Sequence, residues 1–224
     1  MSERKDLQRR NSQITSKMVK ALDADPYDPK RYYDLGSMLT KMHSFEQAEE
    51  LFLRGLNVFE KEPAKQALLH YGLGNVYYSA GVYDRARQQF SQVKDQKLRT
   101  DALLMIAQGY YAQKQYRQAI AFALTVSENS PSDPTAEALL GDSFLALGDL
   151  KNAEKFYDRS LALGKNNARV NFQRGVVALT QGQDASTFFK RVKNTDPKYF
   201  AENKKRLNDI ATLIKDKHDK DVKG

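Results

Sequence analysis

Between residues 67 and 93, apolar side chains recur at every third or fourth position in two short runs, the spacing of one face of an α-helix. The first run carries Leu69, Leu73 and Tyr77. The second run carries Tyr83, Ala86, Phe90 and Val93. Gly81 separates the runs, and glycine often ends a helix because it tolerates a positive φ. The stretch is therefore predicted to form two short amphipathic helices folded back on each other.

Gly74 lies inside the first predicted helix, where a glycine costs about 1 kcal/mol relative to alanine. Ala86 in the second helix offers a reason, because two small residues that face each other let the helices approach closely. Tyr77, Tyr83 and Phe90 would then fill the space around that contact. The run from Gly72 to Gly74 does not indicate a phosphate-binding loop, since no strand precedes it and the third glycine of the dinucleotide motif is missing.

The same arrangement of small residues occurs five times along the chain. The small residue of the first helix is, in order, Gly36, Gly74, Ala107, Gly141 and Gly175. Its partner in the second helix is Ala48, Ala86, Ala119, Ala153 and Ala185. Successive copies are 32 to 38 residues apart. A repeat of that length indicates a stack of helical hairpins.

This period resembles that of the tetratricopeptide repeat family, whose pattern is W-x2-L-G-x2-Y, then A-x3-F, then P. The matching residues are Tyr32, Leu35, Gly36, Leu39, Ala48 and Phe52 in the first copy; Leu73, Gly74, Tyr77, Ala86 and Phe90 in the second; Ile106, Ala107, Tyr110, Ala119 and Pro131 in the third; Leu140, Gly141, Phe144, Ala153 and Tyr157 in the fourth; and Gly175, Ala185, Phe189 and Pro197 in a degenerate fifth. The resemblance implies an all-α fold, a right-handed superhelix (α-solenoid) of about five helical hairpins with N- and C-terminal capping helices.

The expected organisation has one capping helix at each end of the repeats. Residues 1–28 are predicted to hold the N-terminal capping helix and residues 198–218 the C-terminal one, apolar on the inner side and charged on the outer. Residues 219–224 are predicted to be a disordered tail. The five tetratricopeptide-like hairpins are assigned to residues 29–66, 67–99, 100–133, 134–167 and 168–197.

Two departures from the family pattern carry structural expectations. The first two copies are 38 residues apart, so extra residues are expected after Phe52, in a longer second helix or loop around residues 59–63. Tryptophan is absent from the chain, and the family's tryptophan position holds Tyr32, His70, Leu103, Glu137 and Asn171. The last two are polar and are expected to weaken the inner packing of the C-terminal hairpins.

By the resemblance, the first helices of the hairpins line a concave groove in which a partner lies. Helical spacing selects the residues beside the buried stripe of each first helix. The predicted protein- or peptide-binding residues are Tyr33, Ser37, Tyr71, Asn75, Tyr78, Leu104, Gln108, Tyr111, Asp142 and Phe172. This wall is aromatic and amide-rich, which favours contact with a peptide backbone and apolar side chains. For any single tyrosine, packing between neighbouring hairpins is the alternative interpretation.

Chaperone-binding domains of the same family hold a C-terminal carboxylate with lysine, arginine and asparagine. The corresponding positions here hold Tyr33, Ser37, Gly72, Asp101 and Met105. These residues argue against a carboxylate clamp.

Charge adds a second functional class. From residue 190 onward, eleven Lys and Arg stand against six Asp and Glu, so +5 of the net charge of +8 lies there. The alternative to a protein-binding adaptor is a nucleic-acid-associated regulator that uses Lys190, Arg191, Lys193, Lys198, Lys204, Lys205 and Arg206. Interspersed acidic residues favour instead a solvated capping helix, which makes nucleic acid an unlikely partner. Membrane binding is not expected, because the apolar face of this helix is needed to close the core.

The remaining composition predicts a protein without chemistry of its own. The chain has no cysteine, and its three histidines, His43, His70 and His218, are too scattered for a metal site or a catalytic triad. Asp133, Asp149 and Asp184 fall at turns or helix starts, where capping explains them. No enzyme activity, cofactor or metal is expected. The charged N-terminus and the lack of a long apolar run predict a cytoplasmic protein, either a monomer or a weak homodimer.

Overall fold

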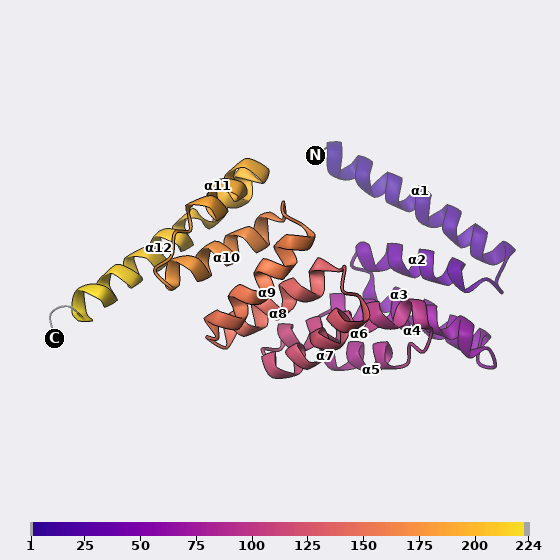
Figure 1. Cartoon of the computed structure of the whole chain (residues 1–224). Helices are drawn as coiled ribbons and strands as arrows, with labels where there is room; N and C mark the ends of the chain where they lie inside the picture. Colours follow the sequence, from indigo (N-terminus) through magenta and orange to yellow (C-terminus); the bar gives the residue numbers. More distant parts are fainter. Residues whose placement is uncertain (1, 222–224) are drawn as a thin grey trace. The chain divides into compact units, whose positions relative to one another are not determined.

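All the regular secondary structure of residues 2–221, the part of the chain that this computed structural model describes, is α-helical (Figure 1). Side chains are described for residues 9–210, 212 and 213. In this range there are twelve helices: α1 (Ser2–Ala24), α2 (Pro29–Lys41), α3 (Phe45–Val58), α4 (Pro63–Ser79), α5 (Tyr83–Ser91), α6 (Gln96–Ala112), α7 (Tyr116–Asn129), α8 (Pro134–Ala146), α9 (Leu150–Leu163), α10 (Ala168–Thr180), α11 (Ser186–Thr195) and α12 (Pro197–Asp221).

The helices divide into two compact units. Unit 1 comprises residues 1–114 with helices α1 to α6, and unit 2 comprises residues 115–224 with helices α7 to α12. The boundary falls in the turn after α6, inside the third predicted hairpin (100–133).

Within unit 1, the first helix of each hairpin packs against its own second helix and against the first helix of the next hairpin. Helix α2 contacts α3 and α4, and α4 contacts α5 and α6. Helices α3 and α5 also contact the first helix that follows them, and α1 packs along α2 (Figure 1). The helices α2, α4 and α6 therefore lie next to one another in this order, and they carry the predicted binding residues of this unit.

Unit 2 repeats the arrangement and closes it with a long helix. Helix α8 contacts α7, α9 and α10, and α10 also contacts α9 and α11. Helix α12 packs against both α10 and α11 (Figure 1). Its Tyr199, Phe200, Leu207 and Ile210 cover a buried cluster made by Phe172, Val176 and Val192. An amphipathic helix that buries the last apolar face and leaves its charges outward is how a repeat stack avoids an open end.

Glycines in the first helices make room for aromatic rings from the second helices. A Cβ atom added at Gly74 would lie 2.6 Å from a ring carbon of Phe90, and one added at Gly141 would lie 2.6 Å from the ring of Tyr157. Such distances are shorter than any van der Waals contact that carbon atoms tolerate. The aromatic side chain therefore occupies the place that a methyl group would need, and the two helices of the hairpin lie closer together.

Phe52 takes part in two such contacts at once. Its ring lies against both Gly36 of α2 and Gly72 of α4, and a Cβ atom at either position would overlap it. Phe52 itself is fully buried. One ring of α3 thus joins the first helices of two successive hairpins.

The structure corrects the predicted reason for Gly74. We expected Ala86 to be the residue that Gly74 accommodates, but the three atoms nearest to an added Cβ all belong to Phe90. Ala86 is 1% exposed and is part of the core. Helical spacing placed both residues on the inner face, but it did not determine which one lies over the glycine.

The turns and the helix starts are set by single residues that can be recognised in the sequence. Gly81, Gly148 and Gly182 have positive φ, as do His43 and Lys114 at the corresponding turns. The capping predicted for three aspartates is confirmed by hydrogen bonds that their carboxylates accept from the backbone N–H groups of Thr135, Asn152 and Ser186. At Asp149, a hydrogen bond from the Asn152 side chain, followed by the bond from its backbone N–H, lowers the pKa of the carboxyl. At the exposed Asp184, the bonds from the backbone N–H and the hydroxyl of Ser186 lower the pKa of the carboxyl.

Two expected boundaries differ from the observed ones. The extra residues after Phe52 do not lengthen α3, which has 14 residues like α7 and α9. Instead they form a turn and the start of α4, which begins at Pro63 because proline is favoured at the first helical position. At the other end, α12 continues through residues 219–221, which we expected to be irregular, since no glycine or proline interrupts the sequence before Gly224. The remainder of the expected tail, 222–224, lies outside the described residues.

The glycine contacts generate a prediction for unfolding. Gly74→Ala should lower the free energy of unfolding by about 1–3 kcal/mol, because the added methyl group displaces the buried ring of Phe90. Chemical denaturation followed by circular dichroism measures this change.

Gly109→Ala is the matched control, since Gly109 is also a glycine within a helix. An added Cβ there would lie 3.6 Å from Arg87 Cγ, an ordinary contact. This substitution should raise the free energy of unfolding by about 0.5–1 kcal/mol through helix propensity alone. Equal effects of the two substitutions would contradict the ring-into-glycine packing.

Candidate functional site

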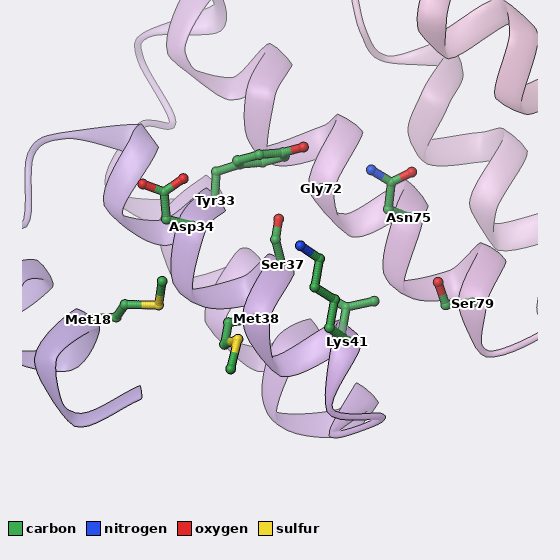
Figure 2. Close-up of a pocket in the computed structure, with 10 residues that line it drawn as sticks. Met18, Tyr33, Asp34, Ser37, Met38, Lys41, Gly72, Asn75 and Ser79 are labelled. Carbon is green, nitrogen blue, oxygen red and sulfur yellow. The ribbon is translucent and has the colours of Figure 1, made fainter. Parts of the chain in front are cut away.

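Unit 1 contains an open groove of about 500 Å³ between α1, α2 and α4. Its lining residues are Met18 of α1; Tyr33, Asp34, Ser37, Met38, Thr40 and Lys41 of α2; and Gly72, Asn75 and Ser79 of α4. Figure 2 shows Ser37 and Lys41 on one helix and Asn75 and Ser79 on the neighbouring helix. The groove thus brings together Tyr33, Ser37 and Asn75, three of the predicted binding residues.

Helix geometry explains why these side chains share one surface. Tyr33, Ser37 and Lys41 are four residues apart on α2, as are Asn75 and Ser79 on α4, so each set forms a row along its helix. Tyr32 and Gly36, which directly precede Tyr33 and Ser37 on α2, are buried. Because α2 and α4 are in contact, the two rows lie next to each other.

Tyr71 extends the polar surface of the groove along α4. Burial raises the pKa of its hydroxyl above 10.0, the nearby Asp101 and Tyr33 act in the same direction, and a hydrogen bond with Asn75 lowers it. Its ring also packs against Phe90, with ring centroids 5.6 Å apart. Tyr71 therefore both stabilises the hairpin and reaches the polar groups of Tyr33 and Asn75.

The remaining predicted residues of unit 1, Tyr78, Leu104, Gln108 and Tyr111, are not among those that line this groove. Tyr78 packs edge-on against Tyr83 at 5.4 Å between ring centroids, and burial followed by the influence of Tyr83 raises the pKa of its hydroxyl. Leu104, Gln108 and Tyr111 lie on α6 and are all half-buried. For Tyr78, packing within its own hairpin, the alternative interpretation, describes the observed contact.

Several groove residues were not selected from the sequence. Asp34, Met38 and Lys41 are four and three residues apart on α2 and form a row next to that of Tyr33, so a wider selection on the same helix would have included them. Gly72 was considered only for a phosphate-binding loop and for a carboxylate clamp, and the sequence favours neither. Met18 belongs to α1, whose packing against the first hairpin was predicted, but its place in the groove was not selected from the sequence.

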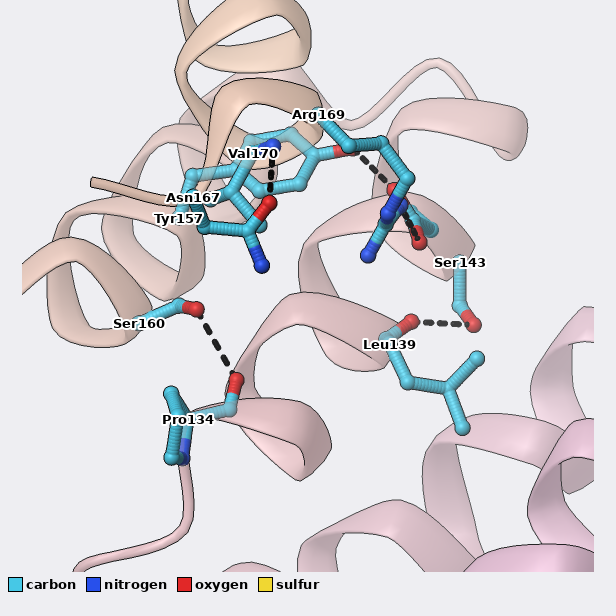
Figure 3. Close-up of polar contacts among 9 residues, drawn as sticks. Pro134, Leu139, Ser143, Tyr157, Ser160, Asn167, Arg169 and Val170 are labelled. Atoms are coloured by element: carbon cyan, nitrogen blue, oxygen red, sulfur yellow. Dashed lines mark hydrogen bonds and ion pairs between the residues drawn. The ribbon is translucent and has the colours of Figure 1, made fainter. Parts of the chain in front are cut away.

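Asp142, in unit 2, is engaged within the protein. Its side chain is 8% exposed. One carboxylate oxygen accepts a hydrogen bond from the Tyr157 hydroxyl at 2.7 Å, and the other lies 2.5 Å from Arg169 Nη1 (Figure 3). In Figure 3 the neighbouring Ser160 donates to the backbone oxygen of Pro134, a contact that ties α9 to the start of α8.

Phe172 has no exposed surface. Its ring packs against Phe189 and Tyr199, with centroid distances of 5.6 and 5.9 Å, and α12 covers it. The prediction placed Asp142 and Phe172 on an open wall, and their burial corrects it. Spacing on α8 and α10 identified the right face, but Tyr157, Arg169 and α12 already occupy that face.

The basic residues of the alternative function are all exposed. They are Lys190, Arg191 and Lys193 of α11 and Lys198, Lys204, Lys205 and Arg206 of α12. Lys198 is 3.9 Å from Glu202, and the Arg206 guanidinium lies 6.0 Å from the Phe172 ring centroid. Two of these seven basic side chains, Lys198 and Arg206, therefore already lie close to another side chain of unit 2.

In the described part of the chain, no set of three or more His, Cys, Asp or Glu side chains is arranged to hold a metal ion. His70 Nδ1 lies 2.8 Å from Gln89 Oε1, which links α4 to α5, and His43 sits in a turn with its ring against Phe45. Over residues 2–221, no helix combines the length and apolar composition needed to cross a bilayer.

Comparison with known sequences identifies the repeat. A sequence profile for the tetratricopeptide repeat matches residues 33–97 and 104–168, more than half of the 224 residues. Lipopolysaccharide assembly protein B from Escherichia coli strain K12 is 29% identical over 143 residues, and the same protein from Escherichia coli O157:H7 matches equally. The aligned part is 60% of this chain and 37% of those relatives, so the chain spans little more than a third of their length.

Solved structures resemble most of the chain at low sequence identity. Pseudomonas aeruginosa pilF superposes with a TM-score of 0.71 at 18% identity, covering 89% of this chain and 92% of pilF. YrrB, described as a repeat protein with an unusual peptide-binding site, superposes with a TM-score of 0.60 at 19% identity, covering 84% and 97%. These structures confirm the predicted all-α repeat fold.

The placement of Asp142 generates a second prediction. Asp142→Ala should lower the free energy of unfolding by about 2 kcal/mol, because the buried Tyr157 hydroxyl loses its acceptor and Arg169 loses its ion pair. Thermal and chemical denaturation measure the change. Asp209→Ala, which removes the same charge from an exposed position of α12 in the same unit, should cause no loss of stability, and similar losses for both variants would contradict the assignment.

Proposed function

Because this chain belongs to the tetratricopeptide repeat family, we propose that it is a protein-interaction scaffold that holds a segment of a partner protein in the groove of unit 1. Proteins with this repeat act as scaffolds for protein interactions, and the fold is generally non-catalytic. The proposal adds the location of the site and the chemistry of its ligand.

One observation carries the proposal. The family resemblance together with helical spacing selected Tyr33, Ser37 and Asn75 as ligand-facing, and these three residues line a single open groove of about 500 Å³. All three are half-buried, so each is held by its surroundings and still presents surface. Partly buried aromatic and amide side chains in a concave site are typical of surfaces that bind proteins.

The composition of the groove favours a peptide segment that is not strongly charged. Asp34 and Lys41 contribute one charge of each sign, and the hydroxyl and amide groups of Tyr33, Ser37 and Asn75 can both donate and accept hydrogen bonds. Such groups match the alternating N–H and C=O groups of an extended backbone. Met18 and Met38 add flexible apolar surface that adapts to different side chains.

The comparisons supply independent support. YrrB, which shares the fold, is described as having a peptide-binding site, and the Escherichia coli relative is named for a role in assembly. We propose by analogy that the present chain also brings a partner into an assembly. The basic helices α11 and α12 remain an alternative surface, on which nucleic acid would bind with a steep salt dependence.

The absence of cysteine allows a direct test of the groove. Ser37→Cys places a single thiol in it, to which a photoactivated cross-linker is attached, and Ser91→Cys places a matched thiol on α5 outside it. In source lysate, the Ser37 probe should capture a partner that the Ser91 probe does not. Mass spectrometry of the cross-linked peptide gives the partner segment, which is then synthesised.

Binding of that synthetic segment decides the proposal. Tyr33→Ala and Asn75→Ala should each weaken its binding about tenfold or more by fluorescence polarisation, since each removes a central contact. Tyr27→Ala and Asn57→Ala, at exposed positions outside the groove, should leave the affinity unchanged. If the groove variants fold and bind as tightly as the unmodified chain, the proposal is wrong. If substitution of the basic residues of α12 instead weakens binding of the segment about tenfold, the binding site is the basic surface and not the groove.

A further inference from the structure

Unit 2 contains a second pocket, of about 360 Å³, that the proposed function does not use. It lies among α7, α8 and α9 and is lined by Ser127, Pro131, Glu137, Arg159, Ala162 and Leu163. Its walls are apolar at Pro131, Ala162 and Leu163 and polar at the other three residues. The pocket therefore combines a hydrocarbon surface with a small number of charged groups, as ligand sites commonly do.

Glu137 is the unusual member of this lining. The residue is only 5% exposed. Its Oε1 accepts a hydrogen bond from the Ser127 hydroxyl at 2.5 Å, whereas its Oε2 is buried with no hydrogen-bond partner among the described residues. Burying a carboxylate oxygen without a donor costs free energy, and natural structures contain few such groups.

The position of Glu137 in the repeat explains why a pocket exists there. It occupies the position where the family pattern has tryptophan, and in the first hairpin this position holds the fully buried ring of Tyr32. A glutamate side chain is much smaller than an indole, so volume is left beside it. The fifth hairpin also has a polar residue there, but the Asn171 amide donates to the backbone oxygens of Lys165 and Asn167.

No residue of the described chain neutralises Glu137 through an ion pair. Arg159 lines the same pocket but is exposed, and its guanidinium lies 5.4 Å from the Phe156 ring centroid. The N-terminal turn of α8, in which Glu137 lies, offers partial compensation through the helix dipole. A ligand that donates a hydrogen bond and a positive charge to Oε2 would complete the site.

We propose that this pocket binds a primary ammonium group carried on an unbranched hydrocarbon stem. The ammonium donates to Glu137 Oε2, and the stem packs against Ala162 and Leu163. A guanidinium fits less well, because its paired donors need two carboxylate oxygens and Oε1 is engaged by Ser127. A divalent cation is also less suited, since the lining supplies only one carboxylate and such ions need several oxygen ligands.

Two sources provide this chemistry, a lysine side chain of a protein and a free diamine. The probes are accordingly Nα-acetyl-lysine methylamide and 1,5-diaminopentane. The Nε-acetylated form of the first probe has the same stem without the charge. Binding is followed on the full chain by NMR chemical-shift changes of the Ser127 and Glu137 amides.

The expected result is binding that requires both the ammonium and the carboxylate. At least one charged probe should bind the unmodified chain, the acetylated probe should not, and Glu137→Gln should weaken binding at least tenfold. Glu128→Gln, at an exposed position of α7, should bind like the unmodified chain. Binding of diaminopentane alone identifies a free amine as the ligand, whereas binding of the lysine derivative identifies a protein side chain.

A stability measurement separates a ligand-binding role from a purely structural one. Without probe, Glu137→Gln and Glu137→Met should melt at the same or a higher temperature than the unmodified chain, because both remove the uncompensated buried charge. A clear fall in melting temperature for both variants would mean that Glu137 stabilises the fold through its hydrogen bond with Ser127. That result would overturn the proposal. So would the absence of charge-dependent binding to the unmodified chain. Neither outcome bears on the groove of unit 1.

Discussion

The insertion of an aromatic ring into the space left by a glycine is the contact on which four of the five hairpins depend. Phe90 lies over Gly74, Tyr157 over Gly141 and Phe189 over Gly175, each ring coming from the second helix four residues after the small alanine of the repeat. The contact lets two helices approach more closely than ordinary side chains allow, and it buries a large apolar surface at the same point. In unit 1, Phe52 extends it to a second glycine, so that one ring fixes α2 and α4 side by side.

The groove of unit 1 is a consequence of this packing. Gly72 meets the ring of Phe52, and it also lines the groove between Ser37 and Asn75. A larger residue at that position would displace Phe52 from the core and add bulk to the surface where we place the ligand. The rows on α2 and α4 are therefore held at a spacing set by the core, on rigid helices, and this preorganisation lowers the entropy that a bound segment must lose.

The sequence predicted the features that depend on neighbouring residues in the chain. Helical periodicity, the turn at Gly81 and the aspartate caps are local, and the structure confirms them. The errors concern non-local contacts. Spacing placed Phe172 beside the buried stripe of α10, but only the fold shows that α12 covers it. Likewise, no local signal indicates that Tyr157 and Arg169 engage Asp142.

The two polar residues at the tryptophan position show how departures from a repeat pattern can be distinguished. We expected both to weaken the packing of the C-terminal hairpins, and each has a buried oxygen without a partner among the described residues. Asn171 compensates, because its amide nitrogen bridges two backbone oxygens and so serves the start of α10. Glu137 has a single hydrogen bond, from Ser127, and it faces a pocket. Selection that acted only on stability would have favoured an apolar residue there, which is why we place a ligand at Glu137 and a structural role at Asn171.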